Sequence, residues 1–438
     1  MDRFVRRQET PEQRERRLLR MAAAPGPEMH LEDLSGFRRP PDWAANIRDS
    51  LCSWTESGKD LSALLVCAGA DAPSYALQDM AIPNTAEVWD IDPSLKPGLL
   101  KLHCSSKKLR LGPVMGDILR YPCSYFGSAN VLVAGPPCPP WSTMGAGKSF
   151  DDPRAKVFDK VLEIVEDQAW RDRSSDDASD AFFMFLLENV EGMLKRSRVD
   201  READRPCPAV RVLHRLEASL PSAWDLALLR VDTSHHGLPQ KRGRVYLRGV
   251  HRGFLVQQGD FQNAFAPARQ IHSGLSSIIR SDLPNTNKTR AGRGNKYMEN
   301  LRRYKVHHAA AMQSPLSEGM VAVVDLSRDR SCEYGEIARF DDRCVCLTAS
   351  NDALWVFSLG VAPASLPPRR MPDVDLPIDR WLHPCERAAL QGFPPDMRVK
   401  ARDAVRVFGN AMSVPVVGLI MYPVLLDVMP AFLQPLSS

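Results

Sequence analysis

One cysteine of this chain stands in a segment suited to covalent chemistry. Residues 135–142 read Gly-Pro-Pro-Cys-Pro-Pro-Trp-Ser and follow a short apolar run that predicts a strand at 130–134. Because prolines fix φ and restrict their neighbours, Pro137 and Pro139 should hold Cys138 on a stiff loop at the end of that strand. A nucleophile needs this placement. The plainer alternative is a cysteine packed in the core as a small hydrophobic residue.

A carboxylate follows the next apolar run in the same way. Residues 182–187 predict another strand, and Glu188 and Asn189 come directly after it. A carboxylate at the exit of a buried strand can lose its solvent and hold a proton at neutral pH, as a general acid must. The alternative is a glutamate that caps the start of a helix.

Two arginines stand two residues apart in the segment Gln-Lys-Arg-Gly-Arg at 240–244. At the edge of a strand, alternate residues point the same way, so Arg242 and Arg244 should present both guanidinium groups on one side. Such a pair suits a phosphate or the carbonyl oxygen of a base. Solvated surface arginines are the alternative.

The elements that must position these residues alternate between short apolar runs and longer stretches of helical spacing. This alternation predicts an α/β open sheet with helices on both faces. Ligand sites of such sheets lie at the carboxyl ends of the strands, where Cys138 and Glu188 are expected. The predicted strands are 61–68, 86–89, 130–134, 182–187, 224–229 and 244–250, and the predicted helices include 155–169 and 209–220.

Composition and hydrophobic pattern divide the chain into four parts. Residues 1–54 mix charge with Pro and Gly and predict an extension that contributes little to the core. Residues 55–250 form the first part of the sheet domain, and 376–438, where apolar helical spacing returns, complete it. Between them, 251–375 predict a smaller, irregular domain with short β-like pieces at 320–325, 343–348 and 353–359.

Composition excludes several classes of protein. The ten cysteines show no metal-binding spacing, so we expect a reduced intracellular protein without a bound metal. The apolar segment 414–433 contains three prolines and an aspartate, which argues against a membrane span. The net charge is only +4, yet residues 264–310 alone carry nine Lys/Arg against two acids, with Tyr297 and Tyr304 among them. This stretch favours phosphate binding, and a solvated loop is the alternative.

Five segments, in this order, resemble the motif set of the cytosine-C5 DNA methyltransferases. They are residues 135–142, 188–190, 240–244, 390–394 and 409–415. Any one of them is only suggestive, but five in sequence, spread over most of the chain, are specific. The resemblance implies a Rossmann-like class I methyltransferase sheet with a smaller target-recognition domain inserted before the C-terminal motifs.

The resemblance also implies a role for each matching catalytic position. Cys138 takes the place of the nucleophile that adds to C6 of a cytosine flipped out of the duplex. Glu188 would bond N3 and the exocyclic amine, while Arg244, together with Arg242, would contact the base carbonyl or the adjacent backbone. Asn189 would brace the loop at Pro137.

The cofactor implied by the resemblance is S-adenosyl-L-methionine. Asp90 matches the acid that binds the ribose hydroxyls, and Asp117 matches the acid that receives the adenine amine. In the first glycine loop Asp71 and Ala72 stand where the family has glycines. The positions expected to touch the cofactor are Cys67, Ala68, Gly69, Asp90, Ile91, Asp117, Ile118, Asn410 and Ala411.

The expected partner is double-stranded DNA, bound by a soluble protein that acts as a monomer, with no membrane and no metal. We expect it in the nucleus of a eukaryotic host, or in the cytoplasm or nucleoid of a prokaryotic one. Two alternatives stay open. The tRNA-cytosine branch of the superfamily usually carries a Cys-Phe-Thr motif that this chain lacks. A catalytically silent homologue would fit the altered glycine loop.

Overall fold

We describe the protein from a computed structural model. The described residues are 42–92, 95, 116–142, 148–171, 181–255, 274–280, 283, 294–307, 321–327, 342–351, 353–359, 378–393, 399 and 401–433.

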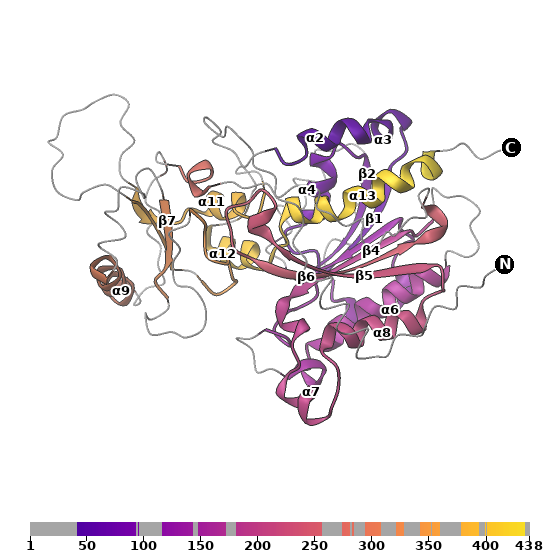
Figure 1. Ribbon diagram of the computed structural model, residues 1–438, viewed down its shortest axis with the longest axis horizontal. Helices are drawn as coiled ribbons and strands as arrows, with labels where there is room; N and C mark the ends of the chain where they lie inside the picture. The colour runs from indigo at the N-terminus through magenta and orange to yellow at the C-terminus, as the bar shows by residue number, and fades with distance from the viewer. Residues whose placement is uncertain are drawn as a thin grey trace, which may run out of the picture.

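A six-stranded sheet forms the larger part of the molecule (Figure 1). Its strands are β1 (Leu61–Val66), β2 (Asn84–Trp89), β3 (Val131–Ala134), β4 (Met184–Val190), β5 (Trp224–Asp232) and β6 (Gly243–His251). They lie in the order β2-β1-β3-β4-β6-β5. The first four run parallel, and β6 runs antiparallel to both β4 and β5. The predicted α/β class with a mainly parallel central sheet is therefore confirmed.

Helices cover both faces of this sheet, as Figure 1 shows. On one face lie α6 (Ala155–Arg171) and α8 (Pro208–Ser219), and on the other lie α4 (Ala72–Asp79) and α13 (Val414–Leu433). Helix α6 turns Phe158, Val161 and Leu162 into the core, the three- and four-residue spacing that the sequence predicted. The short α7 (Arg198–Glu202) extends from the α6 side.

The N-terminal part of the described chain packs into the core, so our expectation that residues 1–54 contribute little to it is wrong for 43–54. Two short helices, α2 (Ala45–Arg48) and α3 (Cys52–Ser57), carry it over α13. Trp43 is 7% exposed and Trp54 is fully buried. A Cβ atom added to Gly418 of α13 would lie 1.9 Å from the Trp43 ring, so a glycine is required there for the tryptophan to fit.

Trp43→Ala is expected to lower the free energy of unfolding by about 3–5 kcal/mol, because it empties a site that the sheet domain fills with a large ring. Denaturant unfolding measures this loss. Trp170→Ala is the matched control, since the Trp170 side chain is 48% exposed. Equal losses in the two variants would contradict a core role for Trp43.

The C-terminal helices complete the same domain. Residues Asp403–Pro430 are long and apolar enough to cross a membrane by composition alone, but 72% of the most apolar window is buried inside the protein. Helix α13 packs against α4 and α3, which explains its apolar character as that of a core helix.

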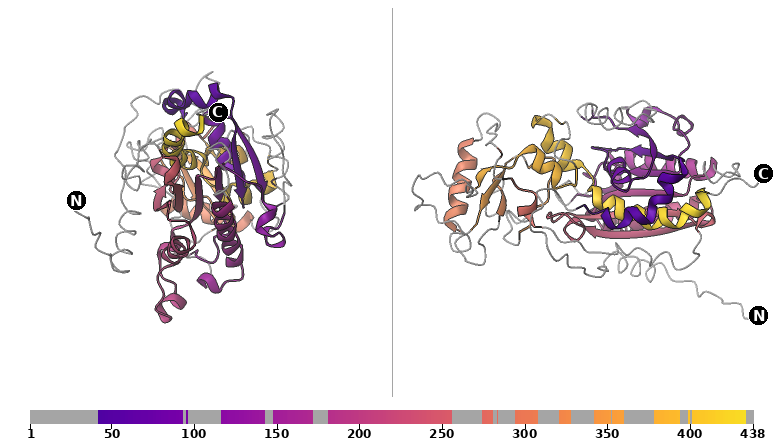
Figure 2. Two further views of the ribbon diagram at one scale, coloured as in Figure 1. Left: turned by 90° about the vertical axis from the view of Figure 1, so that its right-hand side faces the viewer. Right: turned by 90° about the horizontal axis from the view of Figure 1, so that it is seen from above.

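A smaller unit lies beside the sheet domain along the long axis of the molecule (Figure 2). Its sheet has the order β7-β8-β9, with β7 (Val321–Asp325), β8 (Leu354–Ser358) and β9 (Asp379–Trp381) antiparallel. Strand β9 pairs with β8 although it lies beyond residue 375, where we expected the sheet domain to resume. The predicted β-like piece at 343–348 is a loop that lies against the sheet domain and pairs with it through a β-bridge between Gln240 and Cys344. Helices α11 (Pro384–Ala389) and α12 (Ala401–Asn410) connect this unit to α13.

Helix α9 (Gly294–His307) covers the outer face of the small sheet, at the end of the molecule farthest from β1–β6 (Figures 1 and 2). Tyr297 and Tyr304, which lie in the basic stretch predicted to bind phosphate, are buried in that contact and belong to the core of the small unit. Lys296, Arg302 and Arg303 are exposed on the helix. Much of the basic stretch 264–310 lies outside the described residues.

Candidate active site

One cavity of about 520 Å³ opens at the carboxyl ends of the parallel strands, within the range of about 300–1,000 Å³ typical of ligand sites. Of the predicted catalytic residues, Pro137, Cys138, Glu188, Arg242 and Arg244 line it. Of the predicted cofactor residues, Cys67, Gly69, Asp90, Ile91, Asp117, Ile118 and Asn410 line it. The two predicted halves of the site thus share a single cavity.

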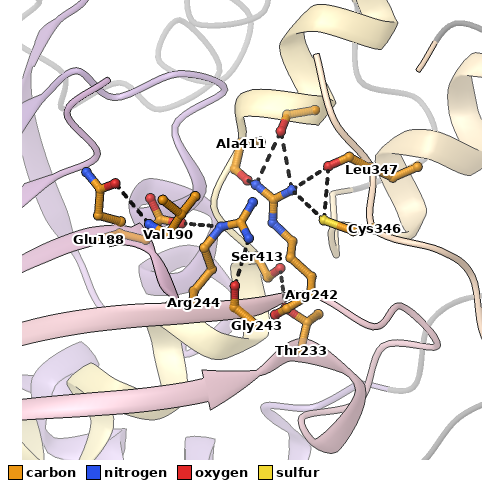
Figure 3. A network of polar contacts seen from close by, with 12 residues as sticks. Glu188, Val190, Thr233, Arg242, Gly243, Arg244, Cys346, Leu347, Ala411 and Ser413 are labelled. Carbon is orange, nitrogen blue, oxygen red and sulfur yellow. Dashed lines mark hydrogen bonds and ion pairs between the residues drawn. The ribbon is translucent and has the colours of Figure 1, made fainter. Parts of the chain in front are cut away.

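Strand pairing brings Glu188 and Arg244 together. Because β6 runs antiparallel to β4, the start of β6 lies beside the carboxyl end of β4, with Val190 opposite Arg244 and Glu188 opposite Tyr246. Side chains two residues apart on neighbouring strands share a face and can meet diagonally. Arg244 Nε lies 2.9 Å from Glu188 Oε1, and both side chains are nearly buried (Figure 3). The carboxylate predicted at the end of this strand therefore forms a largely buried ion pair with Arg244.

The loop that carries Cys138 is held at several points. Asn189 donates from Nδ2 to the carbonyl oxygen of Pro136 at 3.1 Å, as the expected bracing role requires. The amides of Trp141 and Ser142 both donate to the Cys138 carbonyl at 3.0 Å. None of these bonds uses Cys138 Sγ. They hold the loop in place and leave the thiol out of these hydrogen bonds.

The thiol of Cys138 lies in a field of mixed charge. Burial raises its pKa and the Glu188 carboxylate raises it further, while Arg244 and Arg242 lower it. The net pKa is above that of a free thiol. Cys138 therefore starts mainly as the neutral thiol, and any loss of charge on Glu188 favours its thiolate.

A second thiol, that of Cys67, faces the same cavity. Burial raises its pKa, and Asp90 and Asp117 raise it further. Cations lower the pKa of Cys138, whereas each charged neighbour that acts on Cys67 disfavours its thiolate. The signs of the neighbouring charges therefore favour Cys138 over Cys67 as the thiol suited to nucleophilic attack.

Arg242 does not sit as predicted. Its side chain is buried, 2% exposed, and its guanidinium donates to the backbone carbonyls of Leu347 and Ala411 at 2.6 and 2.7 Å (Figure 3). Burial, with the neighbouring charge of Arg244 adding, lowers its pKa. The expectation that both arginines offer free guanidinium groups to a ligand is wrong for Arg242, because its two Nη atoms are already bonded.

The cofactor half of the cavity is built on the exit of β2. Asp90 accepts from the amides of Gly69 and Asp92, each at 2.8 Å, so it ties the β1 loop to the β2 loop. Ile91 is 71% exposed and faces the cavity, while Ile118 is buried. The exposed apolar side chain of Ile91 suits a flat aromatic ring, and the carboxylates that line the same cavity suit hydroxyl and amine groups.

The altered glycine loop keeps the backbone path of a glycine turn. Gly69 has φ +58° and Asp71 has φ +63°, a left-handed conformation that Asp tolerates better than most residues. The Asp71 carboxylate accepts from the amide of Ser74 at 3.1 Å and caps α4. Asp71 does not line the cavity, and neither do the predicted residues Ala68 and Ala411.

Sequence reasoning missed Arg406 of α12. Arg406 lines the cofactor half of the cavity and lies 3.2 Å from Asp92 in an ion pair. It stands four residues before Asn410, so the two share one face of a helix. Helical spacing counted backwards from Asn410 would have found it.

Several known proteins are similar to parts of this chain. The family model described as C-5 cytosine-specific DNA methylase matches residues 106–424. The Type II methyltransferase M.HpaII of Haemophilus parainfluenzae is 24% identical over 296 residues, which cover 66% of this chain and 69% of that protein. M.NgoBV of Neisseria gonorrhoeae is 27% identical over 170 residues, 39% of this chain. The match spans only about a third of M.NgoBV, 34% of its length.

Solved structures share the fold. A methyltransferase of Entamoeba histolytica, EhMeth, has a TM-score of 0.51 to this chain and is 16% identical, covering 84% of this chain and 98% of its own. At this identity the likeness concerns the fold alone.

Proposed function

Since the chain belongs to the C-5 cytosine-specific DNA methylase family, we propose that it transfers a methyl group from S-adenosylmethionine to C5 of cytosine in double-stranded DNA. The observation that carries the proposal is the shared cavity, in which Cys138 and the Glu188–Arg244 pair lie beside the Asp90 and Asp117 carboxylates.

Cys138 supplies the nucleophile. C5 of cytosine is not reactive enough by itself, so the Cys138 sulfur adds to C6 and a C6–S bond forms. The ring then carries enamine character at C5, which takes the methyl group. Loss of the C5 proton and departure of the sulfur restore the aromatic ring and free the thiol.

Glu188 and Arg244 hold the ring through these steps. Addition at C6 places negative charge on the N3 side of the ring, where a carboxyl group on Glu188 can donate a proton or a hydrogen bond. Arg244 lies 2.9 Å from Glu188 and can donate to the adjacent carbonyl oxygen of the base. Their ion pair fixes both groups before the base arrives, which reduces the cost of ordering them.

The cofactor half fits an adenosine-containing ligand. Asp90 and Asp117 offer carboxylates for the ribose hydroxyls and the adenine amine, and Ile91 offers an exposed apolar surface for the ring. S-adenosylmethionine supplies an electrophilic methyl group when bound there. The first glycine loop, turned by Gly69 and Asp71, leaves its backbone next to that space.

The proposed DNA duplex hides C6 within its base stack, so the target cytosine must rotate out of the helix to reach Cys138. We propose that residues 251–375 recognise the flanking sequence and that 55–250 with 376–438 form the catalytic domain. The small unit supports this role because its loop at 344–347 adjoins the start of β6, close to Arg244.

Methylation of a plasmid tests the proposal. The protein is incubated with duplex plasmid and S-adenosylmethionine, and bisulfite sequencing reads protected cytosines. We expect protection at a recurring sequence, and none without the cofactor. Methylation of a tRNA pool treated in the same way, without methylation of the plasmid, would instead support the tRNA branch. Methylation of neither, together with no binding of S-adenosylmethionine at millimolar concentration, would support a silent homologue.

Asp90→Asn is expected to raise the Kd for S-adenosylhomocysteine about tenfold, because an amide has one acceptor oxygen and cannot serve both loop amides as the carboxylate does. Isothermal calorimetry gives the affinity. Asp49→Asn, an exposed aspartate of the N-terminal segment, is the control and should bind normally. An unchanged Kd in Asp90→Asn would remove Asp90 from the cofactor site.

A further inference from the structure

We infer that Arg242 is a positioning residue. It holds residues 409–411, part of which forms one wall of the cofactor site, and makes no contact with DNA. This inference rests on the proposed function. The guanidinium of Arg242 reaches backbone carbonyls in two other segments of the chain (Figure 3). Nη1 donates to Leu347 at 2.6 Å and Nη2 donates to Ala411 at 2.7 Å, while both lie 3.3 Å from the carbonyl of Gly409.

These carbonyls need such a donor. Gly409 belongs to the last turn of α12, and the final carbonyls of a helix have no partner within it. The helix dipole adds a partial negative charge at that end, which favours a cation. A buried carbonyl without a donor would be costly, and Arg242 brings two donors in one planar group.

The loop that Arg242 holds is a wall of the cavity. Gly409 and Asn410 line the cofactor half, and the carbonyl of Asn410 lies 4.0 Å from where a Cβ atom on Gly69 would stand. The next residue but one, Met412, comes within 2.8 Å of the corresponding position on Gly135, in the catalytic loop. A shift of residues 409–412 would therefore change the space offered to the cofactor.

Arg242 also fixes the small unit through its bond to Leu347, and the nearby Gln240 holds the same residue. Gln240 accepts from the amide of Leu347 at 3.0 Å and donates to the carbonyl of Leu390 at 2.7 Å. A Cβ atom on Gly409 would lie 2.3 Å from the amide nitrogen of Ala349, so this loop rests directly on the end of α12. Arg242 thus joins the start of β6, the small-unit loop and the cofactor wall at one point.

The rival explanation is that Arg242 touches the base or its phosphate, because part of its side chain borders the cavity beside Arg244. The two explanations predict opposite kinetic patterns. A residue that shapes the cofactor wall affects affinity for the cofactor, whereas a residue that contacts the reacting base affects the rate at saturating cofactor.

Arg242→Lys separates them, because an ammonium group keeps the charge but cannot reach both carbonyls as a planar fork does. We expect the Kd for S-adenosylhomocysteine and the KM for S-adenosylmethionine to rise about tenfold or more, with kcat changed less than about threefold. Arg244→Lys is the matched control and should show the reverse, a lower kcat with an unchanged Kd. A lower kcat and unchanged Kd in Arg242→Lys would overturn the inference.

Gly409→Ala tests the same contact if Arg242→Lys does not fold. Its added methyl group pushes α12 away from residues 348–349 without altering any charge, so it should reproduce the higher Kd and KM. Normal cofactor affinity in folded Gly409→Ala would contradict the inference. The Kd arm needs no turnover, so a wild-type protein that binds cofactor but methylates nothing would refute the proposed function while still giving a result for Arg242.

Discussion

Replacing Cys138 with serine is expected to lower the methylation rate by about 10³-fold or more, because a neutral hydroxyl is a far weaker nucleophile than a thiol that can ionise. Transfer of a tritiated methyl group to duplex DNA measures the rate. The affinity for S-adenosylhomocysteine should stay unchanged, since the loop is held through the Cys138 carbonyl and through Asn189, which the substitution leaves in place.

Cys52→Ser is the control for this substitution, because Cys52 is an exposed cysteine of α3 away from the cavity. It should retain full activity. Substantial methylation by Cys138→Ser would eliminate Cys138 as the nucleophile and leave Cys67 as the other thiol facing the same cavity.

Glu188→Gln is expected to change two reactions in opposite directions. Methylation should fall by about 10²- to 10⁴-fold, the range for loss of a general acid. Alkylation of Cys138 by iodoacetamide should become faster at any pH below the thiol pKa. The Glu188 charge raises that pKa while Arg244 and Arg242 lower it, so removing the carboxylate moves the pKa down and increases the thiolate fraction.

The alkylation rate measured from pH 6 to 10 gives the pKa directly. In the wild type the rate should rise above the pH at which a free thiol ionises, and in Glu188→Gln the rise should come at lower pH. Glu191→Gln is the control, since Glu191 follows the same strand but pairs with Arg230 and does not line the cavity. A Glu188→Gln profile that matches the wild type would disprove the electrostatic link between Glu188 and Cys138.

The sequence predicted the sheet and the main catalytic groups because those signals are local. Gly135 directly follows β3 and Glu188 lies two residues before the end of β4, so the apolar runs locate the strand ends closely, and parallel strands collect these ends at one edge. The Glu188–Arg244 pair could not be predicted in this way. It depends on β6 running antiparallel to β4, and direction within a sheet is decided by the packing of distant segments.

Arg242 shows where a local rule fails. We assumed that Arg242 and Arg244 alternate along a strand, but β6 begins at Gly243, so Arg242 lies outside it and its side chain turns toward Leu347. No pattern in the sequence marks position 347 as its partner, more than a hundred residues away.

Two buried segments have a charged local composition that hides their role in the core. Trp43 and Trp54 belong to the core, yet averaging over a charged N-terminal stretch concealed them. Tyr297, Leu301 and Tyr304 have the four- and three-residue spacing of one helix face, so helical periodicity predicts their burial although the residues between them are charged or polar.

The contact between Trp43 and Gly418 has a consequence for how the chain folds during synthesis. Strand β1 and helix α4 emerge from the ribosome early, but one face of their sheet is covered by α13, more than three hundred residues later. A contact of such long range forms late and slowly. Until α13 has been made, nascent chains expose an apolar sheet face that chaperones would be needed to shield.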